Sequence, residues 1–148
     1  MNYQFQHSVQ AGVGRQAAWD FWTNVDNWAL DPAVESVTLD GEFAAGSEGT
    51  THTKGGPEPI KWKMTSVTPG TEAVIEIPLP GAVVRFEWKF EEVNSKRTTL
   101  TQKITLNGEK VEDYMPMVGQ DFENGVRQGM AKLAAEMSVK KVYRKRMT

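Results

Sequence analysis

The chain has 148 residues, enough for a single domain that buries about 70 % of the surface of the unfolded chain. Hydrophobic residues make up 39 % of the sequence and charged residues 24 %, and no apolar run approaches the roughly 18 residues of a membrane span. The absence of cysteine excludes disulfides, thiol nucleophiles and thiolate metal sites. Because the start, Met1 to Gln4, is polar and unlike a signal peptide, we expect a cytoplasmic protein.

The net charge of −2 provides no general attraction to nucleic acid, and we expect no nucleic-acid partner. Positive charge is concentrated in a basic tail, residues 140–148, which carries Lys140, Lys141, Arg144, Lys145 and Arg146. We interpret this tail as a solvated helix end that complements the helix dipole. Contact with a protein partner or an anionic surface is the alternative interpretation.

The first half of the chain begins with a strand and a short helix. Residues 3 to 13 alternate between apolar and polar side chains, which is typical of a half-buried strand, and His7 falls on the apolar side. Helical spacing follows at Ala18, Phe21, Trp22 and Val25. Polar residues from Asn24 to Asn27 then predict a bend before Trp28.

One motif at this junction resembles a nucleotide-binding turn. Gly12, Gly14 and Ala17 have the Gly-x-Gly-x-x-Gly/Ala spacing between a strand and a helix. However, a doubly wound nucleotide fold requires continuously apolar parallel strands and crossover helices, whereas this strand alternates. We therefore interpret the glycines as a turn into the helix.

The middle of the chain predicts six further strands, at 33 to 40, 47 to 55, 59 to 68, 72 to 79, 82 to 93 and 97 to 107. Short separators rich in glycine and proline join them, which suits antiparallel hairpins and leaves no room for crossover helices. Between Met64 and Val67 the alternation fails, which indicates a β-bulge.

The last element is a long helix from about residue 113 to 141. Its apolar side chains form one stripe, at Val118, Phe122, Val126, Met130, Leu133 and Met137. We expect an α+β fold in which this helix lies on a curved antiparallel sheet and encloses a cavity. Gly125 and Gly129 each cost the helix about 1 kcal/mol, so either a close approach of the sheet to the helix or a wider cavity should offset them.

Alternation within the strands predicts which side chains face the helix. This face should carry His52, Ile60, Trp62, Met64, Ile75, Ile77, Leu79, Val84, Phe86, Trp88, Phe90, Leu100, Gln102, Ile104 and Leu106. From both sides of the cavity, our candidates for ligand binding are Trp22, Trp28, Trp62, Met64, Ile75, Phe86, Trp88, Gln102, Phe122, Val126 and Met130. For each apolar candidate, ordinary core packing is the alternative.

Few polar side chains are candidates for contact with a ligand in the cavity. His7 and His52 could donate to a carbonyl or act as acid and base near neutral pH, and the alternative is that both are satisfied core residues. Acidic residues mostly point outward, so we expect no metal site. Neither a Ser-His-Asp arrangement nor a carboxylate pair can be identified, and we expect no cofactor.

The order of elements resembles the large SRPBCC superfamily, which includes START domains, birch-pollen-type allergens and the polyketide cyclase/dehydrase group. The resemblance covers about residues 3 to 139 and is carried by Ala18-Trp19 with Trp22, Asn27-Trp28, Gly46 to Gly49, Trp62 to Pro69, Phe86 to Phe90 and the final helix. It implies a helix-grip fold: a seven-stranded antiparallel sheet around a long C-terminal helix, with two short helices after the first strand. One departure is Val13-Gly14, where the family usually has Ala-Pro before the first helix.

Members of this superfamily bind lipids, sterols, polyketides, quinones or plant hormones, and some are cyclases or dehydratases. Our leading hypothesis is therefore a binding protein for a small apolar molecule. The alternative is a polyketide cyclase or dehydratase that uses His7 or His52 as acid or base, and whether the protein is an enzyme stays open. A co-chaperone-like module that binds through the basic tail is a third hypothesis. A monomer and a homodimer are both compatible with the sequence.

Overall fold

The computed structural model describes the backbone of residues 2–56 and 58–147, and their side chains as far as Val139. The basic tail and its expected role therefore lie outside the described side chains. In chain order the elements are β1 (Tyr3–Ala11), α1 (Arg15–Thr23), the 3₁₀ helix η1 (Val25–Leu30), β2 (Val34–Asp40), β3 (Glu48–Thr53), β4 (Ile60–Thr68), β5 (Glu72–Leu79), β6 (Ala82–Asn94), β7 (Arg97–Asn107), α2 (Val111–Tyr114), the 3₁₀ helix η2 (Met115–Met117) and α3 (Gln120–Met147).

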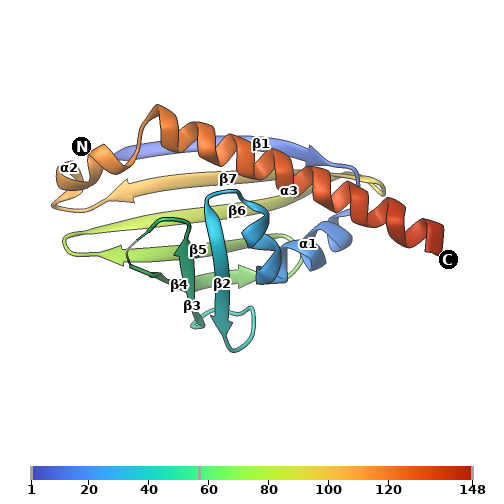
Figure 1. The fold of residues 1–148 in the computed structure, drawn as a ribbon, viewed down its shortest axis with the longest axis horizontal. Coiled ribbons are helices and arrows are strands. Elements are labelled where there is room, and N and C mark those ends of the chain that lie inside the picture. The colour runs from blue at the N-terminus through green and yellow to red at the C-terminus, as the bar shows by residue number, and fades with distance from the viewer. Residues whose placement is uncertain (1, 57, 148) are drawn as a thin grey trace.

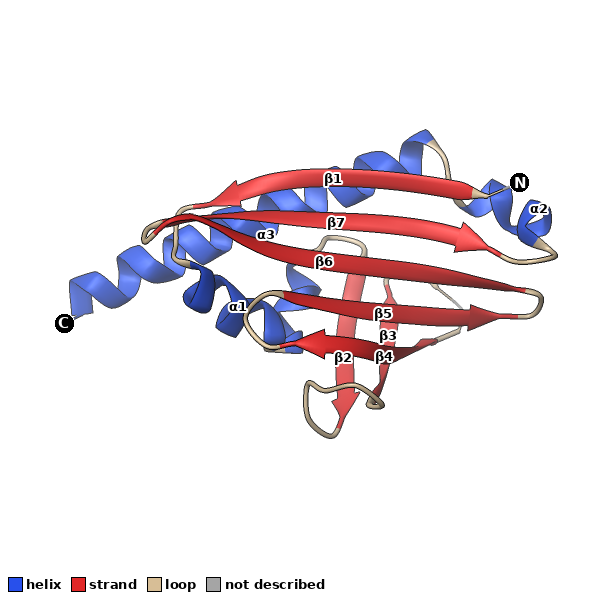
Figure 2. Ribbon diagram, turned by 180° about the vertical axis from the view of Figure 1, so that it is seen from behind, coloured by secondary structure: helices blue, strands red, loops and turns tan. Residues whose placement is uncertain are grey.

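The seven strands form one antiparallel sheet in the order β1-β7-β6-β5-β4-β3-β2. Figure 1 shows α3 running along the length of this sheet. In the reverse view of Figure 2 the strands lie in front of α1 and α3, so both helices cover the same face. The predicted helix-grip α+β fold is confirmed, and the register of β4 on β5 shifts between Met64 and Ser66, where a bulge was expected.

The long helix begins later than its apolar stripe predicted. Residues 111 to 117 form α2 and η2 instead, and α3 starts at Gln120. Pro116 lies within η2, and Gly119 has a φ of 144°, a backbone conformation that stops a helix. Val118 therefore belongs to the turn before the helix, and the stripe on α3 starts at Phe122.

The core lies between α3, α1 and the inner face of the sheet. Helix α1 buries Ala18, Trp19 and Trp22, whose spacing places them on one side of a helix. From α3, Met130, Leu133 and Met137 are buried, whereas Phe122 and Val126 are only partly buried. The helix is thus tightly packed toward its C-terminal half and more loosely covered toward its start.

Of the two glycines of the rejected nucleotide motif, Gly14 is required by close packing against backbone, and Gly12 is closely packed against a side chain. A Cβ on Gly14 would lie 2.8 Å from the Ser95 carbonyl oxygen, and one on Gly12 would lie 3.0 Å from Ser138 Oγ. Gly14 caps the start of α1, so the turn into the helix is present as predicted. Of the helices in the described part of the chain, none is long and apolar enough to cross a membrane.

Candidate functional site

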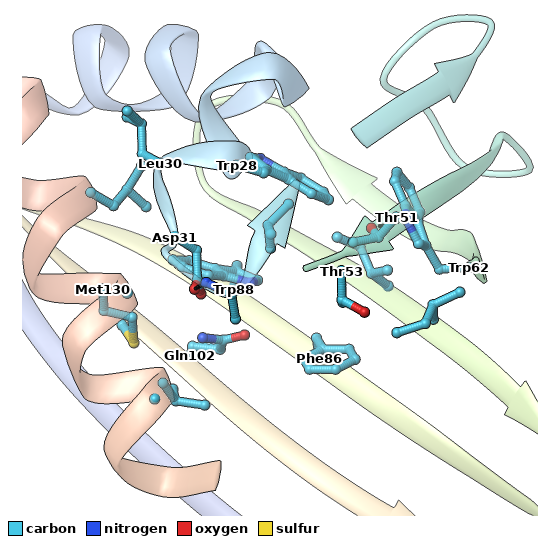
Figure 3. A pocket seen from close by; sticks show the side chains of 18 of the residues that line it. Trp28, Leu30, Asp31, Thr51, Thr53, Trp62, Phe86, Trp88, Gln102 and Met130 are labelled. Atoms are coloured by element: carbon cyan, nitrogen blue, oxygen red, sulfur yellow. Dashed lines mark hydrogen bonds between the residues drawn. The ribbon is translucent and has the colours of Figure 1, made fainter. Parts of the chain in front are cut away.

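A cavity of about 490 Å³ lies between the inner face of the sheet, the first half of α3 and the segment from α1 to β2. This volume is within the range of pockets for small molecules. Figure 3 shows part of the lining, which consists of Trp22, Asn27, Trp28, Leu30, Asp31, Ala33, Val34, Thr51, Thr53, Ile60, Trp62, Ile75, Ile77, Phe86, Trp88, Gln102, Asp121, Phe122, Gly125, Val126, Gly129, Met130 and Leu133.

Four tryptophans form a continuous aromatic wall in this lining. Trp22 stacks on Trp28 with ring centroids 5.5 Å apart, and it also contacts Trp88 at 5.1 Å. Trp28 in turn contacts Trp62 at 5.2 Å. The indole N–H of Trp28 donates to the Trp22 carbonyl oxygen at 2.7 Å, and that of Trp62 donates to Thr51 Oγ1 at 2.9 Å. These bonds hold the rings so that the wall is largely formed before a ligand arrives.

Gln102 is the one buried amide side chain among the described residues of the lining. Its side chain is 8 % exposed, and its neighbours across the ladder are His7 on β1 and Trp88 on β6. No hydrogen bond to its side-chain amide is found within the described structure, and Figure 3 shows the amide among the cavity side chains. The polar atoms of this amide keep access to solvent in the open cavity, so Gln102 is available to hydrogen-bond a ligand.

Asp31 brings a carboxylate to the cavity at the end of η1. Its Oδ1 accepts a hydrogen bond from the Ala33 N–H at 2.9 Å. Its Oδ2 lies so close to α3 that a Cβ on Gly129 would be only 2.6 Å away. Gly129 is therefore the residue that allows this carboxylate to approach the helix.

The two helix glycines have different roles. A Cβ on Gly125 would meet no atom within 4 Å, because this glycine borders the open cavity. Gly129 instead makes room for Asp31. The wider cavity that was one of the two explanations accounts for Gly125, whereas the group that approaches Gly129 is Asp31, after η1, and not the sheet as the other explanation expected.

The expected position of His52 is wrong. The register pairs Thr51 with Ile60 and Gly49 with Trp62, so odd-numbered residues of β3 share the face of even-numbered residues of β4. His52 is consequently exposed on the other face. Its neighbours Thr51 and Thr53 line the cavity in its place.

His7 is half-buried on the helix-facing side of β1, as its alternation predicted, but it does not line the cavity. Met64 is fully buried in the core and also lies outside the lining. The other ten proposed binding residues line the cavity together: Trp22, Trp28, Trp62, Ile75, Phe86, Trp88, Gln102, Phe122, Val126 and Met130. Their contact with a ligand stays a prediction.

Sequence reasoning missed most of the segment from η1 to β2, where Asn27, Leu30, Asp31, Ala33 and Val34 contribute to the lining. Asn27, Leu30 and Asp31 follow no helical or strand period, and the strand predicted at 33 to 40 was not assigned a face. A usable signal was present at Gly49, because a Cβ there would overlap the Trp62 ring. A glycine opposite a tryptophan would have indicated the correct face of β3.

The ionisable side chains that line the cavity are acidic. Asp31 and Asp121 are part of the lining, and the described lining residues include no lysine, arginine or histidine. Asp31 is half-buried and Asp121 is exposed. Within the described part of the chain, no three His, Asp or Glu side chains are grouped so as to hold a metal ion.

Comparison with protein families gives a match over residues 3–138 to the family described as "Polyketide cyclase / dehydrase and lipid transport". The chain belongs to this family. Polyketide cyclase/dehydrase and lipid transport proteins are part of the SRPBCC superfamily that the sequence patterns indicated. A search of curated protein sequences gave no match.

Solved structures share this family's fold at low sequence identity. The aromatase/cyclase Zhui from Streptomyces sp. R1128 is 14 % identical with a TM-score of 0.71, and the match covers 93 % of this chain and 94 % of Zhui. Norcoclaurine synthase from Thalictrum flavum, in complex with dopamine and hydroxybenzaldehyde, is 11 % identical with a TM-score of 0.71 and coverages of 95 % and 88 %. A protein from Arthrobacter aurescens is 18 % identical, with a TM-score of 0.72 and coverages of 91 % and 86 %.

Proposed function

We propose that this protein binds one small, largely apolar, ring-bearing molecule in the cavity between the sheet and α3. The observation that carries the proposal is the cavity of about 490 Å³, which combines a preformed tryptophan wall with the buried, unpartnered amide of Gln102. Apolar walls supply affinity and a few polar groups fix orientation, as in small-molecule sites generally.

Burial of about 300 Å² of apolar ligand surface at about 25 cal/mol per Å² would supply several kcal/mol before the costs of association. Micromolar affinity is therefore attainable without covalent chemistry. The ring edges of the ligand would pack against Trp88 and Phe86. Gln102 would form a hydrogen bond with a carbonyl, hydroxyl or amine group of the ligand.

The acid–base route of a cyclase or dehydratase receives less support. His52 is exposed on the outer face of β3, and His7 lies outside the lining. A general acid or base must come within hydrogen-bond reach of the proton that it moves. Ligand binding, which requires neither histidine, is the function that we propose.

Native mass spectrometry of protein purified gently from its own host tests the proposal. Gly125→Leu is the blocking variant, because the new side chain enters open space in the cavity and removes no core contact. Gln128→Leu adds a leucine at an exposed position of α3 outside the lining and is the matched control.

Wild type and Gln128→Leu should retain a small molecule, and Gly125→Leu should lose it. The mass of the retained molecule would identify the ligand class. Absence of any retained molecule from wild type, together with a melting temperature that does not respond to a library of apolar ring compounds, would contradict the proposal.

A further inference from the structure

The charges around the cavity favour one kind of ligand over others. Its described lining contains two carboxylates and no basic side chain. An anionic ligand, such as a fatty acid or an aromatic acid, would lose its hydration there and find no cation to pair with. A ligand with a positive charge would instead gain a counter-ion.

Asp31 is the better placed of the two carboxylates. It is half-buried, and among the described residues no basic side chain forms an ion pair with it. The Ala33 N–H binds its Oδ1, which leaves Oδ2 to face Gly129 on the cavity side of α3. Asp121 is exposed, so solvent and salt screen its charge more strongly.

The aromatic wall also suits a cation. Ammonium groups are attracted to the faces of tryptophan rings, most strongly where water is excluded. Trp88 and Trp28 both border the cavity. Gln102, buried and without a partner beside Trp88, offers a carbonyl oxygen to a second N–H of an amine.

We infer that the ligand is an aromatic amine that is protonated at neutral pH, with Asp31 as its counter-ion and the tryptophan wall around its rings. This inference rests on the proposed function and adds the charge of the ligand to it. Gly129 leaves room for this counter-ion, because a side chain at this position would displace the Asp31 carboxylate.

Three probes of matched shape separate charge from ring burial: naphthylethylamine, naphthylethanol and naphthylacetate. They are cationic, neutral and anionic at neutral pH, and isothermal titration calorimetry gives the affinity of each. The amine should bind wild type about tenfold more tightly than the alcohol, and the acid should bind most weakly. Added salt should reduce the preference for the amine over the alcohol.

Asp31→Asn removes the charge and keeps an oxygen that can accept the Ala33 N–H. In this variant the amine should bind no more tightly than the alcohol, whose affinity should be unchanged. Gly129→Ala tests the same carboxylate from the helix side and should also reduce the preference for the amine. Asp40→Asn makes the same change of net charge at an exposed position outside the lining, and it should retain the wild-type preference.

Equal affinities of amine and alcohol for wild type would overturn the inference about charge and leave the proposed binding function standing. The inference about charge is also wrong if Asp31→Asn, shown to be folded by circular dichroism, retains the preference for the amine. If none of the three probes binds wild type, both the inference and the proposed ring-binding function are wrong.

Discussion

At the scale of single residues, Thr98 and Gln102 form an informative pair. Both are buried on the helix-facing side of β7, at 0 % and 8 % exposure. Thr98 Oγ1 donates to the Val13 carbonyl oxygen at 2.9 Å, whereas the Gln102 amide has no hydrogen-bond partner within the described structure. The Thr98 hydroxyl therefore stabilises the fold, whereas the Gln102 amide faces the cavity and is available to a ligand.

Substitution by apolar residues of similar size should separate these roles. Thr98→Val should lower the free energy of unfolding by about 1 kcal/mol, because the Val13 carbonyl loses its partner. Gln102→Leu should leave the free energy of unfolding nearly unchanged, because it breaks no hydrogen bond of the described structure. Urea denaturation measures both. An equal loss of stability in the two variants would contradict a ligand-directed role for Gln102.

At the scale of elements, the start of α3 is fastened to β1. The Tyr3 hydroxyl donates to Glu123 Oε2 at 2.6 Å, and its ring meets Phe122 edge to face at 6.4 Å. The Arg127 guanidinium lies 5.0 Å from the centroid of the Phe5 ring. These contacts hold the loosely covered half of the helix above the cavity.

Burial, together with the hydrogen bond to Glu123 and its charge, raises the pKa of Tyr3 well above its usual value of 10.0. The folded protein thus holds this proton more tightly than the unfolded chain does. The stability that Tyr3 contributes is fully present below pH about 10 and is lost as the pH rises above it.

Tyr3→Phe should lower the free energy of unfolding by about 1 kcal/mol at neutral pH, because the bond to Glu123 is lost. It should also make the decline of stability above pH about 10 less steep than in wild type. Urea denaturation over this pH range measures both effects. If the free energy of unfolding falls equally steeply with pH in wild type and Tyr3→Phe, the pH-dependent contribution assigned to Tyr3 is wrong.

The two glycines of α3 provide a second prediction at this scale. Gly125→Ala should raise the free energy of unfolding by up to about 1 kcal/mol, because alanine favours the helix and the new Cβ meets no atom within 4 Å. Gly129→Ala should gain less or lose stability, because its Cβ would meet Asp31 Oδ2 at 2.6 Å. Thermal unfolding compares the two, and equal gains would show that the Asp31 carboxylate does not depend on Gly129.

At the scale of the whole molecule, the buried residues form two clusters that share a border. The tryptophans belong to the larger cluster or pack against it, whereas Ile104, Leu106 and Val111 belong to the smaller one. Ile77 and Phe86 pack against both clusters. Packing that is continuous across the sheet should make the two parts unfold together.

We therefore predict one cooperative transition for the chain, as for a single domain. Urea denaturation followed by tryptophan fluorescence and by far-ultraviolet circular dichroism should give the same midpoint, because the first reports the larger cluster and the second the entire sheet and its helices. Midpoints that clearly differ would indicate that the smaller cluster unfolds independently.

Local patterns predicted most of the elements. Alternation in β6 and β7 identified both strands and the face that carries Phe86, Trp88 and Gln102, because the side chains of a strand alternate strictly. The bulge after Met64 was predicted because the alternation failed there. The start of α3 was not predicted correctly. Pro116 and Gly119 interrupt the helix with a turn, but the apolar spacing continues across that turn and gives no sign of it.

The sequence by itself determined a long helix on a curved antiparallel sheet and the aromatic character of the cavity, because both follow from the periods and the types of neighbouring residues. Tertiary structure decided the polar groups of the site. Thr51 lines the cavity instead of His52 because the hairpin register sets which faces of β3 and β4 coincide. The pattern of a single strand carries no information about this register. Asp31 joined the cavity because Gly129, far away in the chain, leaves room for its carboxylate.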